Sequence, residues 1–232
     1  MPTFSDASAN RILHALSRRD RQRLQAHCVP VMLEYGDVLC DPGERIRSVY
    51  FPHNSLVSLL TPVDGAWSEV GLVGNEGIVG ATLALGVPVS AVRMLVQGTG
   101  SALRMSSVSF RREIKGSTAL RQQLDYYLYR LLVQTSQTAA CNLLHLVRPR
   151  LVRWLLLTQD RTLSSEFQLT QDFLARMLGI RRASVAQAAA VLQKEKLIRY
   201  SRGHFLILDR KGLERAACTC YAIGNTLCTG AG

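Results

Sequence analysis

Motifs that mark common enzyme classes and membrane proteins are missing from this sequence of 232 residues. It contains no His-Glu-x-x-His, Gly-x-Ser-x-Gly or Walker motif, and the glycines from Gly74 to Gly80 do not follow the dinucleotide fingerprint. No apolar stretch approaches the roughly 18 residues of a membrane span, and no signal peptide is recognisable. We therefore expect a cytoplasmic protein that is not an enzyme and has no membrane partner.

Acidic residues are scarce relative to basic ones. The chain has 28 Lys or Arg against 17 Asp or Glu, a net charge of +11, and 47% of its residues are hydrophobic, enough for a substantial core. The excess is uneven, because residues 1–147 carry +3 and residues 148–232 carry +8. A small, strongly basic C-terminal domain is typical of proteins that contact nucleic-acid phosphates.

The segment 169–198 has the pattern of a DNA-binding helix-turn-helix. Apolar residues recur at helical spacing from Leu169 to Leu178, Thr170 can cap the first helix, and Gly179 breaks it. A second periodic segment begins at Arg182. Its predicted inward residues are Val185, Ala188, Ala189 and Leu192. The predicted outward face is small and basic, as a helix in a major groove about 12 Å wide requires.

Residue types on this outward face suit base and phosphate contacts. An arginine such as Arg182 can donate two hydrogen bonds to guanine, Gln187 can pair with adenine or a phosphate, and Ser184 can hold the backbone. Two apolar segments follow, from Leu197 to Tyr200 and from Phe205 to Leu208, and Ser201-Arg202-Gly203-His204 joins them as a hairpin. This order predicts a winged helix-turn-helix. The candidate DNA-binding residues are Thr170, Gln171, Arg181, Arg182, Ala183, Ser184, Gln187, Lys194, Arg199 and Arg202.

The segment from Thr170 to Gly179, followed by Arg182-Ala183-Ser184-Val185, Gln187 and the wing, resembles the Crp/Fnr transcription regulators. The resemblance implies that Arg182 contacts guanine. Ala183 stands where many members have a base-reading glutamate, and Gln187 replaces a second arginine, which implies a different target sequence. The resemblance also implies that double-stranded DNA and RNA polymerase are the partners of this protein.

Residues 31–104 read as short β-strands separated by Gly, Pro, Asn and Asp, which is typical of an all-β sandwich or barrel. The predicted strands lie at Val38-Leu39, Val49–Phe51, Leu56–Leu60, Val70–Val73 and Val92–Val96. The pattern Gly36-Asp37-Val38-Leu39, Pro42-Gly43-Glu44 and Val49-Tyr50-Phe51 is similar to the cyclic-nucleotide-binding β-roll of the same family. The expected fold class is α+β: a β-roll sensor, a long dimerisation helix and a winged helix-turn-helix.

The resemblance also places an effector pocket in the β-roll. Members that bind cyclic nucleotides hold the phosphate through an Arg-Ser pair, but here Val89 precedes Ser90, so the bidentate charged partner is missing and cyclic AMP is not expected. The sequence is compatible with another small-molecule effector or with none. We expect no cofactor. The candidate pocket residues are Glu76, Gly77, Gly80, Val89, Ser90, Arg93, Ser136 and Gln137.

From Ser117 to about His145 the pattern is that of one long helix. Residues Leu124, Leu128, Leu131, Thr135, Thr138, Asn142 and His145 follow alternating steps of four and three, which predicts a coiled-coil seam and a homodimer. We expect a hinge at Arg148-Pro149 and a new helix from Leu151, with Trp154 as a packing anchor. The predicted domains are residues 1–116, the sensor; 117–147, the dimerisation helix; and 148–232, the DNA-binding domain.

The six cysteines do not match a zinc ribbon or the N-terminal cluster set of the Fnr subgroup. We predict no metal, although Cys141 with His145, and Cys218 and Cys220 with Cys228, leave redox or metal sensing open. A second alternative is a small-molecule-binding adaptor whose basic domain contacts a protein.

Overall fold

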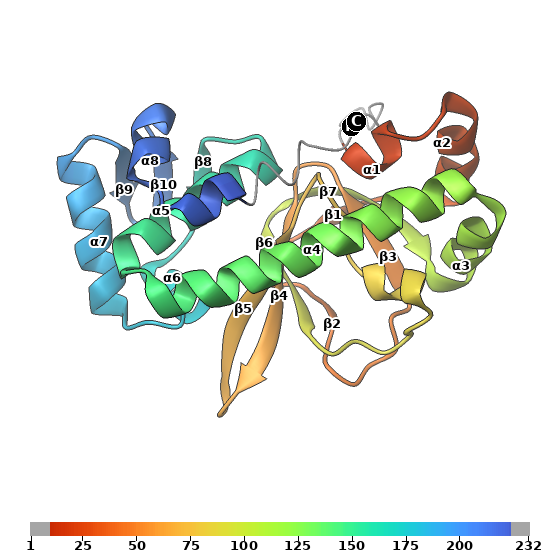
Figure 1. Cartoon of the computed structure of the whole chain (residues 1–232), viewed down its shortest axis with the longest axis horizontal. Coiled ribbons are helices and arrows are strands. Elements are labelled where there is room, and N and C mark those ends of the chain that lie inside the picture. Colours follow the sequence, from red (N-terminus) through yellow and green to blue (C-terminus); the bar gives the residue numbers. More distant parts are fainter. Residues whose placement is uncertain (1–9, 224–232) are drawn as a thin grey trace. The chain divides into compact units, whose positions relative to one another are not determined.

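The computed structural model describes residues 10–223 and contains two compact units (Figure 1). Unit 1 comprises the chain up to Leu59 together with Leu72–Leu131, and unit 2 comprises Leu60–Gly71 together with the chain from Leu132. We describe each unit by itself. Within residues 10–223, no helix has the length and hydrophobicity needed to cross a bilayer.

Two short helices begin the described part of unit 1. The first is α1 (Arg11–His14), and the second is α2 (Arg18–Gln25), which is capped by Ser17 through a hydrogen bond from the Asp20 amide. Asn10 caps α1 and is fully buried. Its Nδ2 donates to the carbonyl oxygens of Pro52 and Gly77 at 3.0 and 2.9 Å, so this side chain ties the N-terminal helix to the β-strands.

The seven strands that precede α3 form two sheets, which confirms the predicted β-rich N-terminal domain. One sheet has the order β1-β7-β3 with antiparallel pairing, and the other has the order β2-β6-β4-β5. The strands are β1 (Cys28–Leu33), β2 (Val38–Cys40), β3 (Ser48–Pro52), β4 (Leu56–Val63), β5 (Ala66–Val73), β6 (Arg93–Gly98) and β7 (Gly100–Ser106), with a 3₁₀ helix η2 (Ala81–Leu85) before β6. Strands β1 and β7 were not among the predicted strands. Pro30 is compatible with β1 because that strand lies at a sheet edge.

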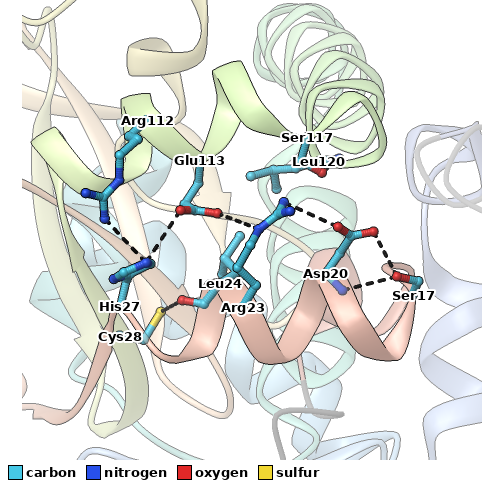
Figure 2. A network of polar contacts seen from close by, with 10 residues as sticks. All are labelled: Ser17, Asp20, Arg23, Leu24, His27, Cys28, Arg112, Glu113, Ser117 and Leu120. Atoms are coloured by element: carbon cyan, nitrogen blue, oxygen red, sulfur yellow. Dashed lines mark hydrogen bonds and ion pairs between the residues drawn. The ribbon is translucent and has the colours of Figure 1, made fainter.

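A network of polar contacts joins α2 to α3 (Ser107–Gly116), as Figure 2 shows. Glu113 of α3 is 7% exposed, and its carboxylate accepts a hydrogen bond from Arg23 Nε at 3.0 Å. The second carboxylate oxygen lies 3.6 Å from His27 Nε2, which in turn lies 3.3 Å from Arg112. Arg23 also pairs with Asp20 at 3.3 Å, so one buried carboxylate and one partly buried carboxylate share its charge.

The predicted long helix is α4 (Thr118–Leu144), 27 residues in length. Leu120, Leu124 and Tyr127 of its first half are buried in the core of unit 1. Leu124 was predicted to lie in a dimer seam, but it is 0% exposed within its own chain and therefore has no surface left for a partner. A helix that packs against its own β-strands has the same apolar spacing as a coiled coil. At this position the heptad pattern therefore marks the inner face of α4 and not a dimer seam.

Unit 2 continues from α4 into α5 (Val147–Thr162), whose N-cap is Leu146. The predicted break at Pro149 is wrong, since this proline lies in the first turn of α5, where its missing N–H has no intrahelical partner to lose. The break falls at His145 and Leu146 instead. Trp154 is buried as predicted, and its Nε1 donates to Glu69 Oε1 at 2.9 Å.

The rest of unit 2 is the predicted helix-turn-helix with its wing (Figure 1). Its elements are β8 (Glu166–Gln168), α6 (Gln171–Leu178), α7 (Arg182–Lys194), β9 (Ile198–Ser201), β10 (His204–Ile207) and α8 (Arg210–Ala216). The three strands form an antiparallel sheet in the order β8-β10-β9. The strand β8 pairs with β10, so the wing has a third strand that the sequence analysis did not predict.

Candidate nucleic-acid interface

The turn between α6 and α7 is built by two local signals that the sequence carries. Thr170 caps α6, and its Oγ1 accepts a hydrogen bond from the Phe173 amide at 3.2 Å. Gly179 ends the helix at φ +62°, a left-handed conformation that favours glycine. Arg181 is the N-cap of α7, in an extended conformation and without a side-chain cap. The Ser184 amide donates to the Arg181 carbonyl at 3.0 Å, which leaves the Arg182 and Ala183 amides of the first turn for an anion.

The two faces of α7 separate as predicted. Val185, Ala188, Ala189 and Leu192 are buried on the inner face. On the outer face the exposed residues are Arg181, Arg182, Ala183, Gln187 and Ala190, whereas Ser184 is partly buried. Small side chains flanking two arginines let the helix backbone approach a duplex closely while the guanidinium groups reach its base edges and phosphates.

One ion pair connects the outer face to the preceding helix. Arg182 lies 3.4 Å from Asp172 in the first turn of α6, and the two side chains are 66% and 57% exposed. An exposed pair of this kind contributes about 0–1 kcal/mol to stability. The Arg182 guanidinium can therefore exchange this carboxylate for a base edge at small cost.

The wing is a tight hairpin with a basic tip. Ser201 pairs with His204 across the two-residue turn of Arg202 and Gly203, whose φ values are +48° and +84°. Positive φ at both central residues is the type I′ geometry that matches the twist of a β-hairpin. The Gly203 carbonyl accepts a hydrogen bond from the Leu169 amide at 2.6 Å, so the wing is joined directly to the start of the helix-turn-helix.

The remaining basic candidates surround this surface. Lys194 ends α7, Arg199 lies on β9, and Arg202 forms the wing tip, and all three side chains are exposed. Phe205 on β10 is fully buried and packs against Tyr200 with 4.3 Å between ring centroids. The wing therefore presents its charges from a strand pair that is held by its own aromatic core. Gln171, the first residue of α6, is partly buried.

The candidate effector residues have varied surroundings. Glu76 accepts hydrogen bonds from the Gly74 amide at 3.1 and 3.3 Å, and Arg93 pairs with Asp41 at 2.5 Å. Ser90 is buried and its hydroxyl donates to the Val92 carbonyl. A Cβ on Gly77 would lie 2.3 Å from the Tyr127 ring, so this tyrosine fills the space beside Gly77.

The other candidates divide between the two units. Val89 is exposed and forms an isolated antiparallel β-bridge with Arg45. A Cβ on Gly80 would lie 3.2 Å from the side chains of Ile46 and Val49. Ser136 and Gln137 belong to unit 2, where Ser136 is exposed and Gln137 partly buried.

A cavity of about 840 Å³ lies elsewhere in unit 1. Three arginines line it, Arg45, Arg47 and Arg111, together with one acidic residue, Glu44. None of the predicted effector residues lines this cavity. Its charge suits an anion, and the sequence offered no signal for it because Arg111 comes from a segment more than 60 residues after Arg45 and Arg47.

A second group of residues was not predicted to form one site. The sequence analysis considered Cys141 and His145 separately from Cys218 and Cys220, but the structure brings all four together in unit 2. No local spacing rule joins two pairs that are more than 70 residues apart. Cys228, the third cysteine considered with the second pair, lies outside the described residues.

Helix, turn, helix and a stranded wing define unit 2 as a winged helix-turn-helix domain, and the comparisons with known proteins agree. Residues 149–216 match the model of the Crp-like helix-turn-helix domain. No curated protein sequence matches the chain significantly.

Solved structures extend the likeness to the whole fold. A Crp/Fnr-family transcriptional regulator from Eubacterium rectale is 13% identical with a TM-score of 0.66, covering 90% of this chain and 98% of that one. FixK2 from Bradyrhizobium japonicum is 14% identical with a TM-score of 0.67, covering 82% and 98%. A Crp/Fnr regulator from Thermus thermophilus is 21% identical with a TM-score of 0.63, covering 82% and 98%. The chain has the fold of the Crp/Fnr transcription regulators and a Crp-like helix-turn-helix domain.

Proposed function

We propose that the chain is a cytoplasmic, sequence-specific DNA-binding transcription regulator and not an enzyme. The observation that carries this proposal is the outer face of α7, where Arg181, Arg182 and Gln187 are exposed beside small residues at an uncapped helix start. In this proposal Arg182 reads a guanine, and Gln187 and Ser184 help to select a base or to hold the DNA backbone. The remaining basic residues contact phosphates. RNA polymerase is the further partner that the resemblance implies.

A homodimer is part of this proposal, because two recognition helices can then enter successive major grooves about 34–36 Å apart on a roughly palindromic site. Support comes from the second half of α4, which leaves large apolar side chains in solvent. Leu132 is 65% exposed and Leu143 83% exposed, and Ser136 and Ala139 between them are also exposed. These four residues follow steps of four, three and four, the spacing of a coiled-coil seam. A second copy of the chain would cover them.

Selection of bound sequences from a random duplex pool tests the DNA-binding proposal. We expect enrichment of an inverted repeat whose half-sites lie one helical turn apart, with affinity that falls steeply as salt increases. Equal affinity for random and enriched duplexes at physiological salt would refute sequence-specific binding and favour an adaptor whose basic domain contacts a protein.

Sedimentation of the purified chain tests the dimer. Leu143→Glu should convert it to a monomer and weaken binding to the full palindrome much more than to a half-site. Leu163→Glu is the matched control, because Leu163 is 69% exposed but lies after α5, away from the proposed seam. A wild-type chain that sediments as a monomer would exclude the proposed arrangement.

Control by an effector bound in the β-rich domain completes the proposal. The cavity lined by Arg45, Arg47 and Arg111 supports an anionic effector, while the candidates from Glu76 to Arg93 mark the location that the resemblance implies. Native mass spectrometry of the purified chain would identify a co-purifying ligand. Loss of that ligand in Arg111→Ala but not in Ser90→Ala would place it in the cavity, and the reverse result would place it at the site implied by resemblance.

A further inference from the structure

Four potential metal ligands converge in unit 2 from two distant segments. Cys141 lies in the last turn of α4, and His145 follows the helix end, with its amide bonded to the Cys141 carbonyl at 3.1 Å. Cys218 and Cys220 come after α8. The three sulfurs and one ring nitrogen all lie within 4.8 Å of one another. An i, i+4 pair on a helix shares one face, so Cys141 and His145 present both ligand atoms in the same direction.

Two of the distances within this group match the edges of a tetrahedral zinc site. Cys141 Sγ and Cys218 Sγ are 3.7 Å apart, and Cys220 Sγ and His145 Nδ1 are 3.6 Å apart. Bonds of about 2.3 Å from Zn²⁺ to sulfur and about 2.0–2.1 Å to nitrogen give tetrahedral edges of about 3.8 Å between sulfurs and about 3.6 Å between sulfur and nitrogen. A disulfide needs sulfurs about 2.05 Å apart, so the two thiols are not bonded to each other.

The surroundings suit a closed, negatively charged metal centre. Cys141 and Cys220 are 1% and 3% exposed, which excludes bulk water from two of the ligands.

Arg150 and Arg153 of α5 are each 8% exposed, and the Nε of each is buried with no hydrogen-bond partner among the described residues. Arg153 donates to Thr138 Oγ1 at 3.1 Å, and Thr138 lies one turn before Cys141 on α4, so this guanidinium lies near the cluster. Three thiolates, a neutral imidazole and Zn²⁺ carry a net charge of −1, which a neighbouring guanidinium stabilises.

We propose that Cys141, His145, Cys218 and Cys220 bind one Zn²⁺ per protomer as a tetrahedral Cys₃His site. Four protein ligands leave no open position, so the site is structural and not catalytic. The metal joins residues 141–145 to residues 218–220 and closes a loop of 72 residues that contains α6, α7 and the wing. It therefore holds the end of the long helix and the segment after α8 together around the DNA-binding elements.

Metal analysis of the full chain tests the proposal. We expect one zinc per protomer after purification under reducing conditions, loss of that zinc in Cys141→Ser and Cys220→Ser, and retention in Cys40→Ser, a buried cysteine in unit 1. Co²⁺ in place of Zn²⁺ should give the visible ligand-field bands of a tetrahedral centre and an intense thiolate-to-cobalt charge-transfer band. Chelation should lower the melting temperature of the wild-type chain and leave that of Cys141→Ser unchanged.

A gain-of-signal variant covers the case in which the serine variants do not fold. His145→Cys supplies a fourth thiolate at the same position, and the cobalt ligand-field bands should move to longer wavelength while the charge-transfer band gains intensity. An unchanged cobalt spectrum in this variant would exclude His145 as a ligand and overturn the Cys₃His assignment. The same conclusion would follow from a wild-type chain that takes up no stoichiometric zinc, or from a Cys141–Cys218 disulfide in non-reducing peptide maps.

Discussion

Replacing Arg182 by alanine is the sharpest test of how α7 recognises DNA. The side chain is 66% exposed and pairs with Asp172 at 3.4 Å, an exposed ion pair that contributes about 0–1 kcal/mol to stability. The variant should therefore fold normally. A bidentate arginine–guanine contact contributes about 1–3 kcal/mol of discrimination, so we expect binding to the preferred half-site to weaken by about 5- to 150-fold. The loss should disappear on duplexes that lack that guanine.

Arg202→Ala is the contrasting variant, because Arg202 lies at the tip of the wing and is expected to contact a phosphate. Its loss should weaken binding to all duplexes about equally and reduce the slope of log K against log salt by about one per wing. Fluorescence anisotropy on the preferred site and on single-base variants, at several salt concentrations, separates the two patterns. Indistinguishable profiles for the two variants would refute the division between base reading and phosphate contact.

Asp172→Ala is the matched control for Arg182→Ala. It breaks the same ion pair and leaves the guanidinium in place. Specific binding should be kept, and overall affinity should rise slightly because one negative charge near the duplex is lost. If Asp172→Ala instead reproduced the loss of specificity, Arg182 would act by holding α6 against α7, and its assignment as a base-reading residue would be wrong.

Three further predictions concern stability and thiol chemistry. Asn10→Ala removes two buried hydrogen bonds and a helix cap, and urea titration should show a loss of about 2–4 kcal/mol, whereas a change under 1 kcal/mol would contradict the bonding described here. Gly212→Ala would place a Cβ 2.4 Å from both Asp209 and Leu197, so the melting temperature should fall unless α8 shifts freely. Cys28, whose pKa burial raises to about 12, should stay a thiol near neutral pH and resist iodoacetamide until the chain unfolds; rapid labelling of the native chain would oppose this.

Local patterns were sufficient to predict the DNA-binding elements. Thr170, Gly179 and the buried face from Val185 to Leu192 each act within one or two helical turns, so residue spacing alone determines the helix ends and inner faces. The wing turn at Gly203 is equally local. Strand β1 was not predicted because half of its residues are exposed and it contains Pro30, so it lacks the alternation that marks a half-buried strand.

Contacts between distant segments could not be predicted in this way. The seam assignment of Leu124 followed a correct helical period, but periodicity does not say whether an apolar face meets a partner or the chain's own strands. The cysteine and histidine pairs illustrate the same limit. Neither pair has the spacing of a known metal site by itself. The two pairs lie close together because the end of α4 and the segment after α8 meet in the folded domain, and residue spacing does not encode that contact.

The seam and the metal site use different faces of the same helix and can therefore be tested separately. At about 100° per residue, Leu143 and Ala139 lie about half a turn around α4 from Cys141. Exposure agrees, because Leu143 is 83% exposed and Cys141 is 1% exposed. Leu143→Glu should thus give a monomer that still binds one zinc, and Cys220→Ser should give a dimer without zinc. Loss of both properties in either variant would mean that the end of α4 unfolds as a whole, and the two faces would then not be independent.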